Sequence, residues 1–245
     1  MMERHATFFT AALGIASLCL ESSASAQSSS ALPVGNITAN PTIVANGAKP
    51  TLTWYITNPS TIRNLVTISS PALIVPTQNL VCDIRILGAG VTSTYPNGAI
   101  QYYETRCQMR SNGSTTWTTV FDGKGSDPIV QSQGIINTSG FSVQKNQPIK
   151  FAAQFRANNA WSQLRTTESG DYAKALVNGD ACPSGVPAFS SPSLKSFLKP
   201  YVDASNKVKI GSMDVILFME LTHTNPADLG YDRQDLVLLI TFRTP

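Results

Sequence analysis

Charge is what this sequence has least of. Asp, Glu, Lys and Arg make up 13% of the 245 residues, about half of the roughly 25% that is usual for soluble domains. The formal net charge is +3, and the basic residues are scattered along the chain rather than gathered into a run. Because nucleic acids and anionic membranes are bound through clusters of Lys and Arg, this distribution argues against both partners.

Histidine and the signatures of familiar catalytic centres are also scarce. The chain holds 2 histidines, His5 and His223, and neither a Gly-x-Ser-x-Gly elbow nor a His-Glu-x-x-His metal motif. Carboxylates for glycoside cleavage can lie far apart in a sequence, so a hydrolase with dispersed acids remains a third alternative. The scarcity favours a non-catalytic protein and leaves enzymatic activity an open question.

The longest apolar run is at the amino terminus, and it is too short to span a membrane. Ala6 to Leu20 is about 15 residues, against the roughly 20 that a spanning helix requires. It follows a charged start and precedes Ala24-Ser-Ala26, a small-residue cleavage signature. We therefore expect a signal peptide over 1–26, a flexible Ser-rich leader over 27–35, and a secreted, periplasmic or cell-surface protein without a membrane span.

Cysteine is rare as well. Only Cys82, Cys107 and Cys182 remain after the predicted cleavage, and their number and spacing do not suit a zinc site. Export permits disulfides, and Cys82 and Cys107 both lie in strand-like runs. We expect a Cys82–Cys107 disulfide, with Cys182 unpaired or bonded to a partner.

What the sequence does contain is a succession of short β-type runs separated by turn signals. The two clearest turns are Ser111-Asn-Gly113 and Ala157-Asn-Asn159. Regular turns between short strands are typical of sandwiches and barrels. We expect one all-β domain over 36–245, a two-sheet β-sandwich of immunoglobulin-like or jelly-roll-like form. The runs that carry this prediction are 80–87, 101–110, 116–121 and 149–155.

The apolar character peaks near the carboxyl end. Met213–Thr222 and Asp235–Phe242 are nearly continuous apolar runs, which predicts a hairpin of strands buried on both faces. Just before it, Ser193 can cap a short helix over Leu194–Lys199, which Pro200 is expected to end. This hairpin is the predicted centre of the core.

One stretch near the start of the mature chain resembles a known family. Ile37–Thr57 contains Pro41-Thr42, then Gly47, then Leu52-Thr-Trp54, a pattern similar to the first two strands of bacterial immunoglobulin-like domains. The resemblance implies a sandwich fold and a spacer or adhesive role. In the second strand Leu52, Trp54 and Ile56 share one face, so Trp54 is predicted to fill the core.

The connection inside the C-terminal hairpin gathers acidic residues. Glu220, Asp228, Asp232 and Asp235, with amide and backbone oxygens, supply enough ligands for calcium, which takes 6–8 oxygens. The alternative is that these are solvated loop acids that close turns. His223 lies in the same connection and is most simply a residue at the rim of the loop.

Part of this connection resembles a second group of proteins. Gly230–Val237 reads Gly-Tyr-Asp-Arg-Gln-Asp-Leu-Val, similar to secreted bacterial domains of unknown function that carry a Glu on one strand and then Asp-x-Asp-Tyr/Phe-Asn-Asp-Leu-Val. By position Glu220, Asp232 and Asp235 match that pattern. Three positions depart from it: Gly230, Arg233 and Gln234 replace an aspartate, an aromatic residue and an asparagine.

Aromatic residues offer a separate route to function. Secreted sandwiches bind sugars by stacking them on exposed aromatic rings. Of the tryptophans Trp54, Trp117 and Trp161, Trp161 follows a turn and is predicted to be exposed. The leading hypothesis is an exported structural or adhesive module, with calcium as its candidate stabilising ion and cell-surface or matrix components or glycans as partners. A carbohydrate-binding module is the alternative.

Overall fold

The computed structural model describes residues 34–40, 51–57, 61–127, 138–183, 197–228 and 230–245. These residues form antiparallel strands with little helix, as the sequence predicts. No helix among them is both long and apolar enough to cross a membrane. The predicted signal peptide lies outside the described residues, whereas Val34 and Gly35 of the predicted leader are already part of a strand.

The first large sheet contains the C-terminal hairpin at its centre. Its five strands run in the order β10-β5-β16-β15-β14. The bounds are β5 Leu80–Ala89, β10 Thr138–Val143, β14 Ala173–Val177, β15 Asp214–Met219 and β16 Leu236–Arg243. β15 and β16 pair in antiparallel register from Asp214↔Thr241 to Phe218↔Val237, which confirms the predicted hairpin.

The second large sheet is built from the middle of the chain. Its main order is β12-β11-β8-β9, and β13 also pairs with β11. The bounds are β8 Glu104–Arg110, β9 Thr118–Gly123, β11 Lys150–Ala157, β12 Ala160–Trp161 and β13 Arg165–Thr166. Both predicted asparagine turns are present, with Asn112, Asn158 and Asn159 at positive φ.

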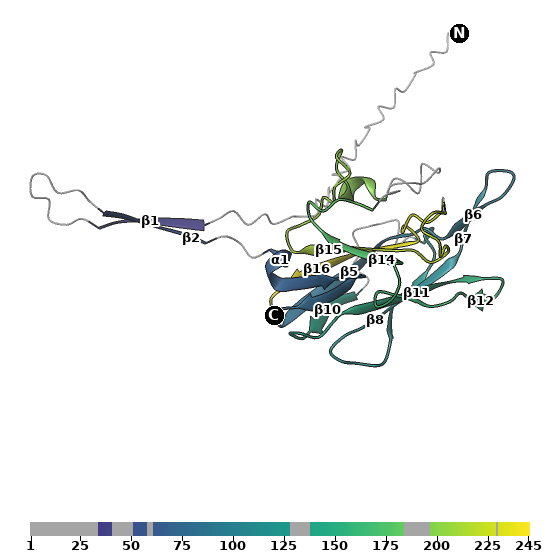
Figure 1. The fold of residues 1–245 in the computed structure, drawn as a ribbon, viewed down its shortest axis with the longest axis horizontal. Helices are drawn as coiled ribbons and strands as arrows, with labels where there is room; N and C mark the ends of the chain where they lie inside the picture. Colours follow the sequence, from purple (N-terminus) through teal and green to yellow (C-terminus); the bar gives the residue numbers. More distant parts are fainter. Residues whose placement is uncertain (1–33, 41–50, 58–60, 128–137, 184–196, 229) are drawn as a thin grey trace, which may run out of the picture.

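The two sheets pack face to face (Figure 1) around one large apolar core. Ile84 and Leu238 enter it from the first sheet, and Met109 and Phe151 from the second. Along β8, buried and partly exposed residues alternate without a break. This is the sandwich that the sequence predicts, because alternation buries one face of a strand and leaves the other to water.

The outer face of the first sheet is covered too, which explains the continuous apolar runs. Ile216, Phe218, Val237 and Leu239 point away from the main core into a second cluster. The chain after β14 closes over them, with partners that include Cys182, Phe197, Leu198 and Val208. β15 and β16 are therefore buried on both faces, as predicted.

One glycine makes this second cluster possible. A Cβ atom on Gly88 of β5 would lie 2.6 Å from the ring of Phe197. Since real Cβ atoms do not approach other carbons so closely, the ring can lie flat on the strand only where there is no side chain. Gly88 therefore lets the covering segment pack directly on the sheet.

The predicted helix before the hairpin is corrected in part. Residues 194–196 lie outside the described residues, and the described helical turn is 3₁₀ helix η1 at Lys199–Tyr201. Pro200 lies inside this turn rather than ending a helix before it. The reason is that proline fits the first positions of a helical turn, where no N–H is required.

The remaining elements are short. Helix α1, Ile62–Leu65, was not predicted, and its Ile62 N–H donates to Ser212 O at 2.8 Å. Two small sheets complete the body: β3 Val66–Ser69 with β4 Leu73–Pro76, and β6 Thr92–Thr94 with β7 Ile100–Tyr102.

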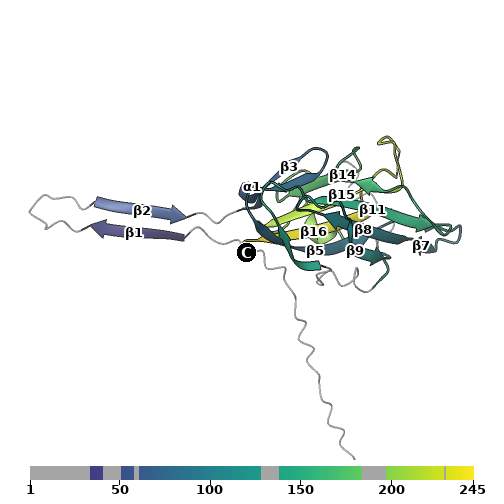
Figure 2. The ribbon, with the colours of Figure 1, turned by 90° about the horizontal axis from the view of Figure 1, so that it is seen from below.

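The immunoglobulin-like stretch forms a hairpin of its own. β1 Val34–Asn40 pairs with β2 Thr51–Thr57, and among the described strands each pairs only with the other. In Figures 1 and 2 this hairpin lies apart from the sandwich. Trp54 is 64% exposed, so the prediction that it fills the core is wrong. Alternation identifies residues that share a face, but not what covers that face.

The predicted Cys82–Cys107 disulfide is absent, which is a second correction. Both residues are free, buried thiols, and Cys182 is free and buried as well. Cys82 lies on β5 and Cys107 on β8, strands of the two facing sheets. Alternation along each strand buries both side chains, but it does not fix the distance between the two Cα atoms, which a disulfide requires to be within roughly 7 Å.

Thiol chemistry tests this arrangement. Burial raises the pKa of Cys82 to about 12 and raises the pKa of Cys107 as well, so neither thiol is ionised near pH 8. We expect a thiol reagent at pH 8 to leave both unlabelled in the native protein and to label both after unfolding without reductant. A denatured, unreduced protein in which these two thiols stay unlabelled would contradict the structure.

Candidate functional site

Acidic cluster at the end of the hairpin

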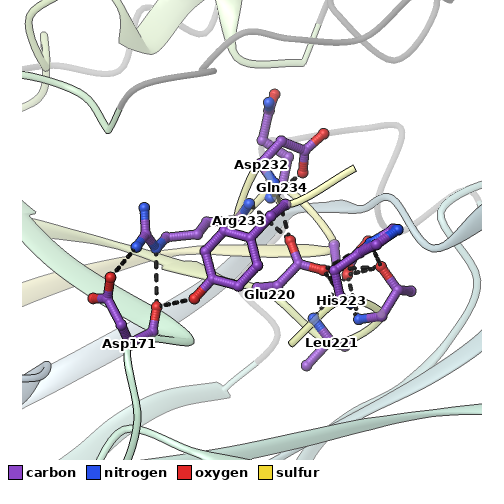
Figure 3. Close-up of polar contacts among 10 residues, drawn as sticks. Asp171, Glu220, Leu221, His223, Asp232, Arg233 and Gln234 are labelled. Atoms are coloured by element: carbon purple, nitrogen blue, oxygen red, sulfur yellow. Dashed lines mark hydrogen bonds and ion pairs between the residues drawn. The ribbon is translucent and has the colours of Figure 1, made fainter. Parts of the chain in front are cut away.

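The C-terminal hairpin brings three of the predicted acids together, and Figure 3 labels two of them, Glu220 and Asp232. Glu220 directly follows β15 and Asp235 directly precedes β16, so the pairing of the two strands places these two residues side by side. Asp232 lies three residues before Asp235. All three are buried, with 0% of Glu220, 9% of Asp232 and 6% of Asp235 exposed.

Glu220 binds the backbone of its own loop. Its Oε1 accepts hydrogen bonds from the backbone N–H groups of Thr222 at 3.1 Å and His223 at 2.8 Å. Its Oε2 accepts from the N–H groups of Asp232 and Arg233, both at 3.1 Å. Although burial opposes ionisation, the hydrogen bonds from Asp235, His223 and Arg233 win, and the pKa of Glu220 lies below its usual value.

Asp235 is the protonated member of the pair that it forms with the Glu220 carboxylate. Burial, followed by the negative charge of Glu220, raises its pKa well above the usual value. The two carboxyl groups hydrogen-bond to each other, which requires one proton between them. Asp235 Oδ2 also accepts from the N–H groups of Leu221 at 2.7 Å and Thr222 at 2.9 Å. One buried carboxylate and one buried carboxylic acid thus hold both ends of the loop.

The pKa of Asp232 lies between those of Glu220 and Asp235. Burial raises its pKa to about 6, and a hydrogen bond from the Gln234 N–H to Asp232 Oδ1, 2.9 Å long, works in the opposite direction. Glu220 raises this pKa further by repulsion. Asp232 is therefore the group of the cluster that changes charge just below neutral pH.

A second set of bonds ties the loop to the chain before β14. The Arg233 guanidinium pairs with the Asp171 carboxylate, and Arg233 Nε donates to Asp171 O at 3.1 Å. The Tyr231 hydroxyl donates to the same carbonyl. Arg233 adopts a left-handed backbone with φ 56°, which turns its N–H toward Glu220 and its side chain toward Asp171. Figure 3 shows both sets of contacts.

His223 packs against Gly230. A Cβ atom on Gly230 would lie 2.3 Å from His223 Cε1, so the ring occupies the space that a side chain at position 230 would need. His223 Nδ1 lies 2.7 Å from Thr222 Oγ1 and 3.5 Å from Glu220 Oε1. The imidazole thus lies beside both Gly230 and Glu220.

The predicted calcium ligands do not form a metal-binding group. Asp228 belongs to a separate exposed turn, where its Oδ1 accepts from Asn225 Nδ2 at 3.1 Å. The oxygens of Glu220 are already used by backbone N–H groups, and Asp235 holds a proton. Within the described parts of the chain, no group of three or more His, Cys, Asp or Glu side chains is arranged to hold a metal ion. Calcium, which takes 6–8 oxygens, is therefore a poor fit to this loop.

The acid pair is equally ill-suited to hydrolysis. Glycoside cleavage requires two carboxyl groups about 5–9.5 Å apart with the sugar between them. Glu220 and Asp235 hydrogen-bond directly to each other and are 0% and 6% exposed. The arrangement stabilises a loop and leaves no space for a substrate between the two groups.

Polar outer face of the second sheet

The second sheet presents a polar outer face. On β8 the partly exposed residues Glu104, Arg106, Gln108 and Arg110 alternate with buried ones. Arg106 pairs with Asp122 of β9 at 2.6 Å. These residues form the outer surface of the sandwich on this side, opposite the core.

Trp161 is held on this face by arginines. The guanidinium carbon of Arg106 lies 4.2 Å from the centre of the Trp161 ring, and that of Arg156 lies 5.9 Å away. Trp161 is half-buried rather than fully exposed. Trp117 has a similar environment at the far end of β8, where Arg110 lies 4.4 Å from its ring centre.

A cleft of about 190 Å³ opens at Arg156. Trp161 does not line this cleft, but it is the cross-strand partner of Arg156 and so lies next to one of its walls. The cleft lies where the β11–β12 turn meets the end of β7 and the residue after β9. Its polar and aromatic lining includes Tyr102, Glu104, Lys124, Arg156, Asn158 and Asn159.

A close backbone contact shapes one wall of this cleft. A Cβ atom on Gly125 would lie 2.2 Å from Ala89 O and 3.1 Å from the Tyr102 ring. Only glycine permits this approach, which brings the segment that carries Lys124 against Tyr102. The wall is therefore set by packing between the two sheets.

The sequence pointed to Trp161 but not to the cleft. Glu104 and Arg156 come from two different strands and Lys124 follows a third, and the three residues carry no shared motif. The Asn158-Asn159 turn was visible as a turn, and it was the only sequence signal that could have marked this edge.

The chain matches no protein-family model, no curated protein and no solved structure. The similarities to immunoglobulin-like domains and to the secreted domains with the Asp-Leu-Val motif therefore remain sequence predictions.

Exchanging carboxyl for amide at each member of the pair tests the location of the proton. Glu220→Gln places an NH₂ group among backbone N–H donors, and we expect a loss of about 2–4 kcal/mol in the free energy of unfolding. Asp235→Asn retains both a donor toward Glu220 and an acceptor for Leu221, so its cost should stay below about 1 kcal/mol. Urea unfolding at pH 7 measures both, and a larger loss for Asp235→Asn would reverse the assignment.

The raised pKa of Asp232 predicts that the stability of the protein depends on pH. The folded protein keeps this proton up to a pKa of about 6, whereas the unfolded chain releases it near 3.8, so stability falls as pH rises between these values and levels off above them. Asp232→Asn, which resembles the protonated acid, should match the wild type at pH 4 and exceed it by roughly 2–3 kcal/mol at pH 7.

The exposed Asp228→Asn is the matched control in the same loop. Thermal melts from pH 4 to 7 distinguish the variants, and a constant difference between wild type and Asp232→Asn at all pH values would contradict the shift.

Proposed function

We propose that this protein is an exported, non-catalytic adhesive module that binds glycans at the cleft beside Trp161. The observation that carries the proposal is the cleft's lining. It combines an aromatic ring, amides, a carboxylate and cations on a rigid sheet edge, next to a tryptophan whose position is fixed by arginines. Predicted secretion supports the same role, because an exported protein meets glycans on cell surfaces and in the surrounding matrix.

The chemistry of the lining suits sugars. Sugar hydroxyl groups can be bound by the amides of Asn158 and Asn159, which both donate and accept, and by the Glu104 carboxylate, which accepts. The ring of Tyr102 offers an apolar surface for the C–H face of a sugar. The cleft's volume of about 190 Å³ is below the roughly 300–1,000 Å³ of pockets for drug-sized ligands, so it fits one sugar residue of a longer glycan.

The acidic cluster has a different role. Its carboxyl groups are buried and hydrogen-bonded within the hairpin, so they are not available to a ligand. Glycan binding is left to the outer face of the other sheet, where polar groups are in contact with solvent.

A glycan array tests the proposal. The labelled wild-type protein should bind a defined set of glycans, and Trp161→Ala should weaken that binding about 10-fold or more, because Arg106 and Arg156 lose the ring that positions them. Trp117→Ala removes the other arginine-stacked tryptophan of the sheet and should leave binding unchanged. Silence of the wild type across the array would overturn the proposal.

A further inference from the structure

We infer that the cleft takes a sugar residue bearing a carboxylate, such as a uronic or sialic acid, with Arg156 and Lys124 binding the carboxylate. The inference rests on the proposed glycan binding and adds the chemical class of the ligand. Its basis is the set of charged groups around the cleft and the interactions that each of them makes.

Cations outnumber acids in the lining. Lys124 and Arg156 line the cleft, and Glu104 is the one acidic residue that does. Asp122 lies nearby but is paired with Arg106, and Asp127 accepts a hydrogen bond from the Lys124 backbone N–H at 2.7 Å. In a chain with 13% charged residues, this excess at one cleft favours an anionic ligand.

Lys124 has no acid partner in the structure. Its side chain is exposed, and no carboxylate of the described residues lies within ion-pair distance of its ammonium group. Lys150, on the same sheet, differs: its Nζ lies 2.6 Å from Glu168 Oε1. An ammonium without a partner at the mouth of a cleft is ready to meet a negative charge from a ligand.

Arg156 has neighbours that orient its side chain, but they do not use all of its hydrogen-bond donors. Its contact with Glu104 is long, with Nη1 at 3.4 Å from Oε2, and its guanidinium carbon lies 5.9 Å from the centre of the Trp161 ring. A guanidinium carries five N–H donors, so most of them remain available within the described structure. Its planar fork matches the two oxygens of a carboxylate, which is the geometry of the strongest such pairs.

The remaining lining residues suit the rest of a sugar ring. Asn158 and Asn159 occupy the two left-handed positions of the β11–β12 turn, with φ 51° and 61°, and both line the cleft. Their amides can serve hydroxyl groups while the cations hold the acid group. A small carboxylic acid without hydroxyls would leave these amides unused.

Titration calorimetry with ligands that differ in charge tests the inference. The probes are trigalacturonate against its methyl ester, and sialyllactose against lactose. In at least one pair the acid should bind 10-fold or more tightly than its neutral form, and the difference should shrink as salt rises. Arg156→Gln and Lys124→Gln should each weaken binding of that acid about 10-fold, a larger factor than the one by which they weaken binding of the neutral form.

Lys150→Gln is the matched control, because it removes the same charge from the same sheet at a residue already paired with Glu168. It should leave binding unchanged, and thermal melts should show that all three variants remain folded. Arg156→Lys retains the charge without the fork and should restore only part of the affinity.

The two proposals fail separately. Equal binding of acid and neutral forms in both pairs, or tighter binding of a sulfated glycan on the array, would overturn the carboxylate assignment while glycan binding stands. No binding of any glycan would overturn both. Loss of binding with Lys150→Gln as large as with Arg156→Gln would show a general charge effect rather than a site.

Discussion

The β15–β16 hairpin, apolar on both faces, is the constraint on which the rest of the structure depends. One face joins the core between the sheets, and the other joins a cluster closed by the chain after β14. Since burying an apolar side chain contributes on the order of 1.5–3 kcal/mol, this central pair is the main source of cohesion in the first sheet. Gly88 contributes to the same burial, because the absence of a side chain there lets Phe197 pack on the outer face of the hairpin's sheet.

The acids at the end of this hairpin are a consequence of that burial. Where two apolar strands end inside the protein, their connecting backbone must find hydrogen-bond acceptors away from water. Glu220 and Asp235 supply these acceptors, and the proton between them reduces the buried charge to one. The residues that looked most like a metal or catalytic site are thus accounted for by the satisfaction of a buried loop.

The sequence predicted the parts of the fold that follow from local pattern. The strand run that contains β8, the apolar hairpin and the two asparagine turns are all present. The predictions that Trp54 fills the core and that Cys82 and Cys107 form a disulfide were wrong for the same reason. Both required knowing which surfaces of the fold meet, and strand alternation does not give that information. The cleft was invisible for the same reason, because Lys124 and Arg156 become neighbours only through the pairing of β9, β8 and β11. The three matched acids of the loop did converge, but the fourth, Asp228, did not.

The loop between β15 and β16 is also joined to the strands on either side of the hairpin. The Glu220 N–H donates to Tyr172 O at 2.7 Å, next to β14, and the Gly90 N–H, just after β5, donates to Asp235 O at 2.8 Å. Irregular connections are usually the first part of a fold to open. Here the amides of Leu221, Thr222 and Arg233 are held by buried carboxyl groups whose own chain is bonded to two further strands. We therefore expect the hydrogen exchange of these amides to be coupled to the opening of the sheet, so that this part of the connection belongs to the same cooperative unit as the core.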